Sequence, residues 1–198
     1  EGWAEYDWRW RTPRQQRRDF GCPTWRGEDI AGKTILLHAE QGLGDTIMAC
    51  RLASVVAGRG ARVVLEVQPA LVRLLRGLAG VAQIVPRGAA LPPAEGEASL
   101  LDLPGILGLD AGTIPAALPY LAAEPERIAR WRQQIDNRPV FKIGVAWQGN
   151  PKSSAELGRS APLTALAPLA AAPGVRLISL QKGPGSEQIW SFPPIEDL

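Results

Sequence analysis

A glycine pair and a carboxylate lie where a strand-like stretch passes into a helix-like one. The segment KTILLHAEQGLGDTIMACRLASVV runs from Lys33 to Val56, and its apolar run is interrupted at Gly42-Leu43-Gly44-Asp45. Ligands of parallel α/β sheets bind beyond the carboxyl ends of the strands, and glycines there let a ligand approach the backbone. Asp45 therefore has two possible roles. It is either a cap for the new helix or a general base that takes a proton from an acceptor hydroxyl.

The glycine loop lacks both common phosphate-binding patterns. The third glycine position of the dinucleotide fingerprint is Ile47, and no Gly-Lys-Ser/Thr of a Walker loop follows, which disfavours a nucleotide-binding oxidoreductase. A helix N-terminus lowers the pKa of a carboxyl, so Asp45 would be a weak base that is always deprotonated. On these local grounds the capping and catalytic roles stay equally open.

Two neighbours of Asp45 also carry chemistry. His38 lies inside the strand-like run, where a lone histidine is more typical of the core than of a site, although a substrate contact stays open. Glu40 is the second carboxylate of the stretch, five residues before Asp45. Asp102 and Asp110 flank a Gly/Pro-rich stretch and read as turn residues.

The composition is that of an ordinary soluble globular protein, with 198 residues, 45% of them hydrophobic and 21% charged. A net charge of +2 is too small to indicate a nucleic-acid partner, and no apolar run is long enough for a transmembrane helix. Cys22 and Cys50 have neither metal nor disulfide spacing, and a single histidine excludes a His-rich metal site. We expect a cytoplasmic protein. The chain starts at Glu1 without a signal peptide, so we also expect it to be cut from a longer one.

Strand-like and helix-like stretches alternate from Lys33 onward, which predicts an α/β fold built of βαβ units with parallel sheets. The expected strands are 34–39, 62–67, 83–85, 100–103, 141–147 and 175–180, the expected helices are 45–59, 69–78, 124–135 and 162–172, and 86–98 is expected to be a loop.

Residues 1–26 differ from the rest of the chain. Trp3, Tyr6 and Trp10 lie on one face of a helix that Pro13 ends, which predicts an amphipathic helix packed on a neighbour. The arginine-rich run that leads to Trp25 is expected to be a solvated linker.

The strand pattern then starts a second time. LLHAEQG at 36–42 is echoed by IGVAWQG at 143–149, and GARVVLEVQ at 60–68 by GVRLISLQ at 174–181. These echoes fit two similar α/β domains in series, the second ending near Leu198 after about two strands.

The stretch HAEQGLGDTI resembles the Gly-Asp motif that opens heptosyltransferase-type glycosyltransferases (family 9), which have the GT-B fold of two facing Rossmann-like domains. The resemblance covers residues 27–198, and EGWAEYDWRW is similar to the segment that closes the tetratricopeptide-repeat (TPR) array in related bacterial proteins. It implies a helical segment and linker at 1–26, an acceptor domain at 27–137 and the beginning of a donor domain at 138–198. Asp45 maps onto the proposed catalytic base, and the acceptor side includes His38, Gln41, Gly42 and Gly44.

On the donor side, the resemblance points to the loop VAWQGNPKSSAELGRSAPL. In the family this loop offers hydroxyls and a lysine to the donor's phosphates, whereas here Gly149-Asn150 and Arg159 stand in their place. An arginine can bind a diphosphate through two hydrogen bonds, although a surface arginine is an equally open interpretation and Lys152 is an alternative cation. The expected donor contacts are Trp147, Gln148, Gly149, Asn150, Arg159, Ser160 and Lys182, which follows Gln181 at the next strand end.

The family's second signature, Asp-Thr-x-x-x-His-Leu, does not occur before Leu198, so we expect this chain to be inactive alone. The resulting hypothesis is an inverting, metal-independent glycosyltransferase without a cofactor. It would move a sugar from a nucleotide sugar to a protein or surface-glycan hydroxyl. The alternative is a non-catalytic TPR-linked binding or scaffold module with a degenerate transferase domain.

Overall fold

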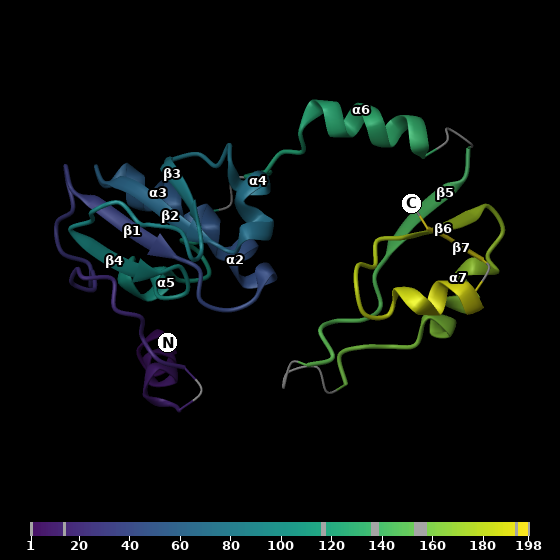
Figure 1. The fold of residues 1–198 in the computed structure, drawn as a ribbon, viewed down its shortest axis with the longest axis horizontal. Coiled ribbons are helices and arrows are strands. Elements are labelled where there is room, and N and C mark those ends of the chain that lie inside the picture. The colour runs from purple at the N-terminus through teal and green to yellow at the C-terminus, as the bar shows by residue number, and fades with distance from the viewer. Residues whose placement is uncertain are drawn as a thin grey trace. The chain divides into compact units, whose positions relative to one another are not determined.

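The computed structural model describes residues 2–13, 15–115, 118–135, 139–152, 158–192 and 194–197. These residues form two compact units, Glu1–Ala123 and Glu124–Leu198 (Figure 1). Each unit contains its own parallel β-sheet with short helices, so the predicted α/β fold with Rossmann-like parallel sheets is confirmed.

The sheet of the first unit consists of β1 (Thr34–His38), β2 (Arg62–Val67), β3 (Val81–Pro86) and β4 (Gly96–Ser99). The strand order is β3-β2-β1-β4, and every pairing is parallel. The chain thus builds the sheet in one direction from β1 and then returns to the other side of β1 with β4. The carboxyl ends of β1 and β4 flank the point where the order reverses, which is where open α/β sheets bind ligands.

Alternate side chains of the strands enter two different cores. On one face, Leu37 and Leu65 pack with the short helices α2 (Leu43–Ala49), η2 (Cys50–Leu52), α3 (Ala53–Gly58), η3 (Pro69–Leu71), α4 (Val72–Leu75) and α5 (Leu103–Ile106). On the other face, Leu36, Val64 and Val85 pack with Phe20, Leu91 and Ala94. Chain segments without regular structure therefore contribute to the second layer.

Several sequence predictions for the first unit need correction. The helix expected at 69–78 is the 3-10 turn η3 followed by α4 and ends at Leu75, and the strand expected at 83–85 is longer, Val81–Pro86. The helix expected at 45–59 begins at Leu43 and is interrupted by the 3-10 turn η2. The strand expected at 100–103 is wrong, because the strand is Gly96–Ser99 and residue 103 already starts α5. The loop expected at 86–98 consequently ends earlier. Gly96 lacks a strand-forming side chain because a Cβ there would lie 3.2 Å from Cδ1 of Ile35 in β1.

The N-terminal segment (residues 2–13 and 15–20) packs on the first unit through its aromatic residues. Its helical part is α1 (Trp3–Tyr6) followed by η1 (Asp7–Arg11), and Pro13 lies just beyond it. The Trp3 indole donates a hydrogen bond of 2.8 Å to the carbonyl of Leu109, and Tyr6 contacts the main core. The expected packed helix is therefore present, in a shorter and tighter form.

The second unit contains α6 (Pro125–Gln134), β5 (Phe141–Val145), η4 (Leu163–Leu166), α7 (Ala167–Ala170), β6 (Val175–Ser179), η5 (Ser186–Ser191) and β7 (Ile195–Glu196). Its three parallel strands have the order β5-β6-β7 around a core that includes Val145, Leu163 and Phe192. The sequence prediction lacked η5 and β7. Within the described ranges, no helix has the length and apolar character needed to cross a bilayer.

Candidate functional site

Four buried carboxylates gather at the carboxyl edge of the first sheet. Glu66 lies in β2 and is 1% exposed, Glu97 lies in β4 and is 5% exposed, and Asp102 follows β4. The side chain of Glu40, which follows β1, is also buried. Burying a charge is costly unless it is paired, so each of these carboxylates must have a partner.

Arg9 of the N-terminal segment is the partner of two of them. Its Nε and Nη2 donate to the two carboxylate oxygens of Glu40, each at 2.7 Å, and Nη2 also lies 2.5 Å from Oδ1 of Asp102. Burial lowers the pKa of Arg9, but the hydrogen bonds to Glu40 and Asp102 outweigh burial and raise it overall. Tyr6 and Trp10 flank the guanidinium, 4.1 and 4.4 Å from its carbon. Arg9 thus joins the ends of β1 and β4.

The Glu40 carboxylate accepts further hydrogen bonds from Ser99 and Gln15. Burial raises the pKa of Glu40, but the hydrogen bonds from Arg9 and Ser99 outweigh it, and the pKa is lowered overall. Glu40 is therefore held ionised as a structural ion-pair partner. Nothing in this arrangement leaves it free to take a proton from a substrate.

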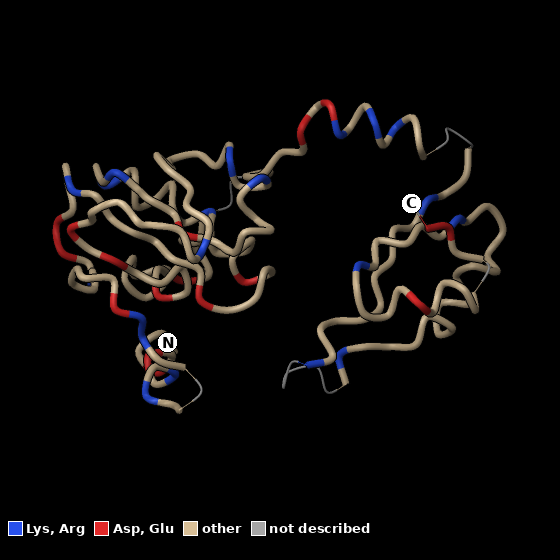
Figure 2. Tube along the Cα trace, in the orientation of Figure 1, with Lys and Arg blue, Asp and Glu red and all other residues tan. Residues whose placement is uncertain are grey.

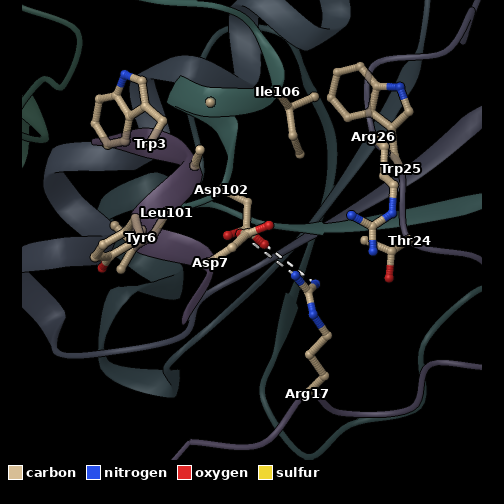
Figure 3. A pocket seen from close by; sticks show the side chains of 12 residues that line it. Trp3, Tyr6, Asp7, Arg17, Thr24, Trp25, Arg26, Leu101, Asp102 and Ile106 are labelled. Carbon is tan, nitrogen blue, oxygen red and sulfur yellow. Dashed lines mark ion pairs between the residues drawn. The ribbon is translucent and has the colours of Figure 1, made fainter. Parts of the chain in front are cut away.

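Two further arginines of the N-terminal segment pair with the same edge. Arg18 binds Glu66 through two hydrogen bonds of 2.6 and 2.8 Å. Figure 3 shows the carboxylates of Asp7 and Asp102 directed toward Arg17, at 4.0 and 3.5 Å, beside a cavity of about 290 Å³. Arg17 and Arg18 are exposed and lie outside helices and strands, as expected for a solvated linker, but each also pairs with a buried carboxylate of the sheet, which the sequence did not predict. Figure 2 colours the acidic residues of the chain red and its basic residues blue along the backbone trace.

His38 and Glu97 form a buried pair across β1 and β4. The His38 Nε2 lies 2.8 Å from Oε2 of Glu97, and the hydroxyl of Thr24 donates to the other carboxylate oxygen. Burial raises the pKa of Glu97, but the hydrogen bonds from His38 and Thr24 lower it overall. Phe20 lies against the imidazole with ring centroids 4.6 Å apart. The Nδ1 atom of His38 is buried without a hydrogen-bond partner among the described residues.

Asp45 caps the helix that follows the glycine loop. It is the third residue of α2, and its Oδ2 accepts the backbone N–H of Gly42 at 2.9 Å. The N-cap residue is Gly42, so Asp45 does not hold the N-cap position that the sequence predicted, although its side chain still caps the helix start from within the first turn. Catalysis by Asp45 stays a prediction. The side chain is half-buried, and its Oδ1 makes no hydrogen bond with a described residue.

The glycine loop is fixed from both sides. The carbonyl of Gln41 accepts a 2.9 Å hydrogen bond from Gln68, which follows β2, and the Gln41 amide donates to the hydroxyl of Tyr6 at 3.0 Å. Gly42 and Gly44 are exposed. The predicted acceptor-side residues therefore lie together at one edge of the first sheet, except that His38 is buried among the strands.

In the second unit one glutamine joins two strand-end loops. The side-chain oxygen Oε1 of Gln181 accepts hydrogen bonds from the backbone N–H groups of Trp147 and Gln148 at 3.0 and 3.1 Å. Its amide donates to the carbonyls of Gln148 and Pro184 at 2.9 and 2.8 Å. All four hydrogen bonds of this side chain are thus used to hold the ends of β5 and β6 side by side.

The loop after β5 folds back on itself. The Ser160 hydroxyl accepts the N–H of Gly149 at 3.0 Å, and the N–H of Ala161 donates to the carbonyl of Trp147 at 3.1 Å. Trp147 is 6% exposed and its ring belongs to the core, so it is a poor candidate for direct donor contact. Asn150 caps the turn at Lys152 through a 3.0 Å hydrogen bond.

The predicted donor cations are both exposed. Arg159 and Lys182 form no ion pair with any residue in the described ranges. Residues 153–157 of the same loop lie outside the described residues. The structure therefore brings together Trp147, Gln148, Gly149 and Ser160, and leaves Arg159 and Lys182 at the surface of the same unit.

Sequence reasoning missed the buried ion pairs of the first unit. A glutamate within the apolar strand RVVLEV is a signal that was available, because a carboxylate buried in a sheet needs a cationic partner. The arginine-rich segment before the sheet is the nearest source of such cations in the chain.

The chain is similar to Protein FlbA of Caulobacter vibrioides, with 26% identity over 210 aligned residues. The alignment covers 96% of this chain and 35% of that protein, so the chain spans about a third of the length of this curated relative. No protein-family profile matches the chain, and no solved structure matches it.

Proposed function

We propose that the chain carries the acceptor domain and the beginning of the donor domain of an inverting, metal-independent glycosyltransferase of GT-B architecture. The proposal rests on one observation: in each of two similar parallel sheets, a loop with candidate site residues follows the carboxyl end of the first strand. The glycine loop with Asp45 follows the carboxyl end of β1, and the loop of Trp147–Asn150 follows the carboxyl end of β5. Strand ends of this kind are the usual ligand sites of α/β sheets.

In the proposed reaction Asp45 is the general base. Its Oδ1, which has no partner among the described residues, takes the proton of an acceptor hydroxyl while Oδ2 stays on the N–H of Gly42. The hydroxyl oxygen then attacks the anomeric carbon of a nucleotide sugar, and the bond from that carbon to the diphosphate breaks. The acceptor is a hydroxyl of a protein or of a surface glycan.

The leaving diphosphate carries the charge that develops in the transition state. Arg159 and Lys182 are the cations proposed to bind it, with amide groups of the Gln148–Asn150 loop. These contacts need no metal ion or other cofactor. We propose a cytoplasmic location, where nucleotide sugars are made.

The test is Asp45→Asn in the full-length protein that contains this chain. Asparagine keeps an oxygen that accepts the N–H of Gly42, so the helix cap is retained while the base is lost. Release of nucleoside diphosphate from nucleotide sugars should fall by a factor of about 10²–10⁴. Asp110→Asn is the matched control, because Asp110 also caps backbone N–H groups, those of Gly112 and Thr113 at 2.9 and 3.0 Å. Equal activity of the two variants would show that Asp45 only caps the helix and is not the general base.

A second candidate function is a non-catalytic binding or scaffold module. The observation that favours it is Arg9, which occupies the carboxyl edge between β1 and β4 where a ligand of such a sheet is expected. If the full-length protein gains no thermal stability from any nucleotide sugar, this second function is the better one.

A further inference from the structure

A cavity of about 360 Å³ lies between the carboxyl edge of the first sheet and the N-terminal segment. Trp10, Gln15 and Arg18 line it from the segment, while His38, Gln41 and Arg87 line it from the sheet and its loops. Its lining is mostly polar, which is unusual for a space that is only a packing defect.

Arg87 is a cation without a carboxylate partner among the described residues. It follows β3, its backbone N–H donates to the carbonyl of Val67 at 2.7 Å, and its Nη2 donates to the carbonyl of Ala39 at the end of β1. The Nε atom is buried and has no hydrogen-bond partner in the described part of the chain, where no carboxylate forms an ion pair with this guanidinium either. A buried guanidinium donor without an acceptor is costly unless a ligand supplies one.

His38 is the second unsatisfied group on the same cavity. It is 5% exposed, and its Nε2 is taken by Glu97. Because an ionised carboxylate can only accept, Nε2 carries the proton of that hydrogen bond, and Nδ1 is the atom left for a ligand. Nδ1 is buried without a partner in the described ranges.

The surrounding carboxylates cannot satisfy either group, because each already has a cationic or imidazole partner. Glu40 is bound by Arg9, Glu66 by Arg18, and Glu97 by His38. The Nε–H of Arg87 therefore has no acceptor among the described carboxylates. The oxygen of an anion is the acceptor best matched to a guanidinium, because the hydrogen bond is then assisted by charge.

We propose that this cavity binds an oxyanion, the carboxylate or phosphate group of a small polar molecule, between Arg87 and His38. One oxygen accepts the Nε–H of Arg87. A second oxygen shares a proton with Nδ1 of His38, either as a phosphate O–H that donates to the neutral ring or as a carboxylate that accepts from the protonated ring. The site does not depend on sugar transfer, because oxyanion binding is measured directly and without a donor sugar.

The single histidine of the chain makes the test specific. With ¹⁵N-labelled histidine, all imidazole nitrogen signals belong to His38, and they can be followed while inorganic phosphate is added to the chain. Acetate is titrated in a second arm, and sodium chloride of equal ionic strength in a third. We expect a saturable shift of the Nδ1 signal with phosphate or acetate and none with chloride. The arm that saturates at the lower concentration identifies phosphate or carboxylate as the ligand group.

Variants connect the signal to Arg87. Arg87→Gln should raise the dissociation constant of the oxyanion at least about tenfold, as expected for loss of a charge-assisted hydrogen bond. Arg62→Gln is the matched control, since Arg62 is exposed at the amino end of β2, on the opposite edge of the sheet. Arg87→Lys keeps the charge and serves if the glutamine variant does not fold. No saturable shift in the unmodified chain, or an equal loss in the Arg62 and Arg87 variants, would overturn the proposal.

Discussion

Arg9 and Glu40 form a bidentate ion pair in which both side chains are buried, 10% and 4% exposed. The Nε–Oε1 and Nη2–Oε2 distances are both 2.7 Å, and Asp102 shares the Nη2 group from the far side of the β1/β4 junction. The N-terminal segment and the carboxyl edge of the sheet are therefore coupled in stability. If the N-terminal segment detached, the carboxylates of Glu40 and Asp102 would lose their arginine partner.

Arg9→Gln should destabilise the first unit strongly, because it leaves Glu40 and Asp102 buried without their cation. Breaking one partner of a buried ion pair costs about 3–5 kcal/mol. Hydrogen exchange of the Leu37 amide in β1 measures the free energy of opening. Arg11→Gln is the control, since Arg11 is exposed against Trp8 and should change that free energy by less than about 0.5 kcal/mol. Similar effects of the two changes would contradict the coupling.

The first unit should lose stability in acid. The pKa values of Glu40 and Glu97 are both lower in the folded protein than the ordinary value of 4.5. Such groups contribute stability above their unfolded pKa and lose it as the pH falls through the folded pKa. Urea unfolding should therefore show a free energy of unfolding that falls as the pH is lowered below about 4.5. A free energy that rises over this range would rule out these ion pairs.

Asp45→Ala should lower the free energy of unfolding by about 1 kcal/mol, since the N–H of Gly42 loses its acceptor and the helix N-terminus loses a negative charge. Asp45→Asn retains the acceptor and should lose less than half of that. Urea unfolding of the three proteins gives the comparison. Equal losses in both variants would show that charge alone, rather than the hydrogen bond, stabilises this helix start.

Gly185→Ala should open the strand-end loops of the second unit. Gly185 has φ of 93°, and a Cβ there would lie 2.8 Å from Cβ of Gln148. Gly183 is the matched control, with φ of 73° and no atom of a described residue within 4 Å of the place its Cβ would take. Both alanines incur about 1–2 kcal/mol for a left-handed backbone, but only Gly185→Ala adds overpacking of about 1–3 kcal/mol.

The indole N–H of Trp147 reports this difference, because it donates to the carbonyl of Gly185 at 3.1 Å. Its hydrogen exchange should be faster in Gly185→Ala than in Gly183→Ala by at least about tenfold. The same exchange rate in both variants would mean that the contact with Gln148 does not restrict this loop.

Strands with regular apolar runs were predictable from local pattern, whereas β4 and the two-residue β7, which lack such a run, were not. Arg62–Val67 has the expected bounds because five of its six residues are buried, whereas β4 is the small and polar stretch Gly96–Ser99. That strand is fixed by its neighbours, since it must leave space for Ile35 and bring Glu97 to His38. The pattern of apolar residues does not indicate either contact. The strand was therefore predicted at the leucine-rich residues 100–103 instead.

The sequence by itself determined the alternation of strands and helices, the second start at Phe141 and the place of Asp45 at a helix N-terminus. These features depend on residues close together in the chain, whose spacing fixes local conformation. Only the tertiary structure decided that β4 returns beside β1, and with it the pairing of Arg9 with Glu40 and Asp102. It likewise placed Arg87 and His38 on one cavity. Contacts between distant residues depend on which strand ends meet at one edge of the sheet, and strand order is set by the packing of the whole unit.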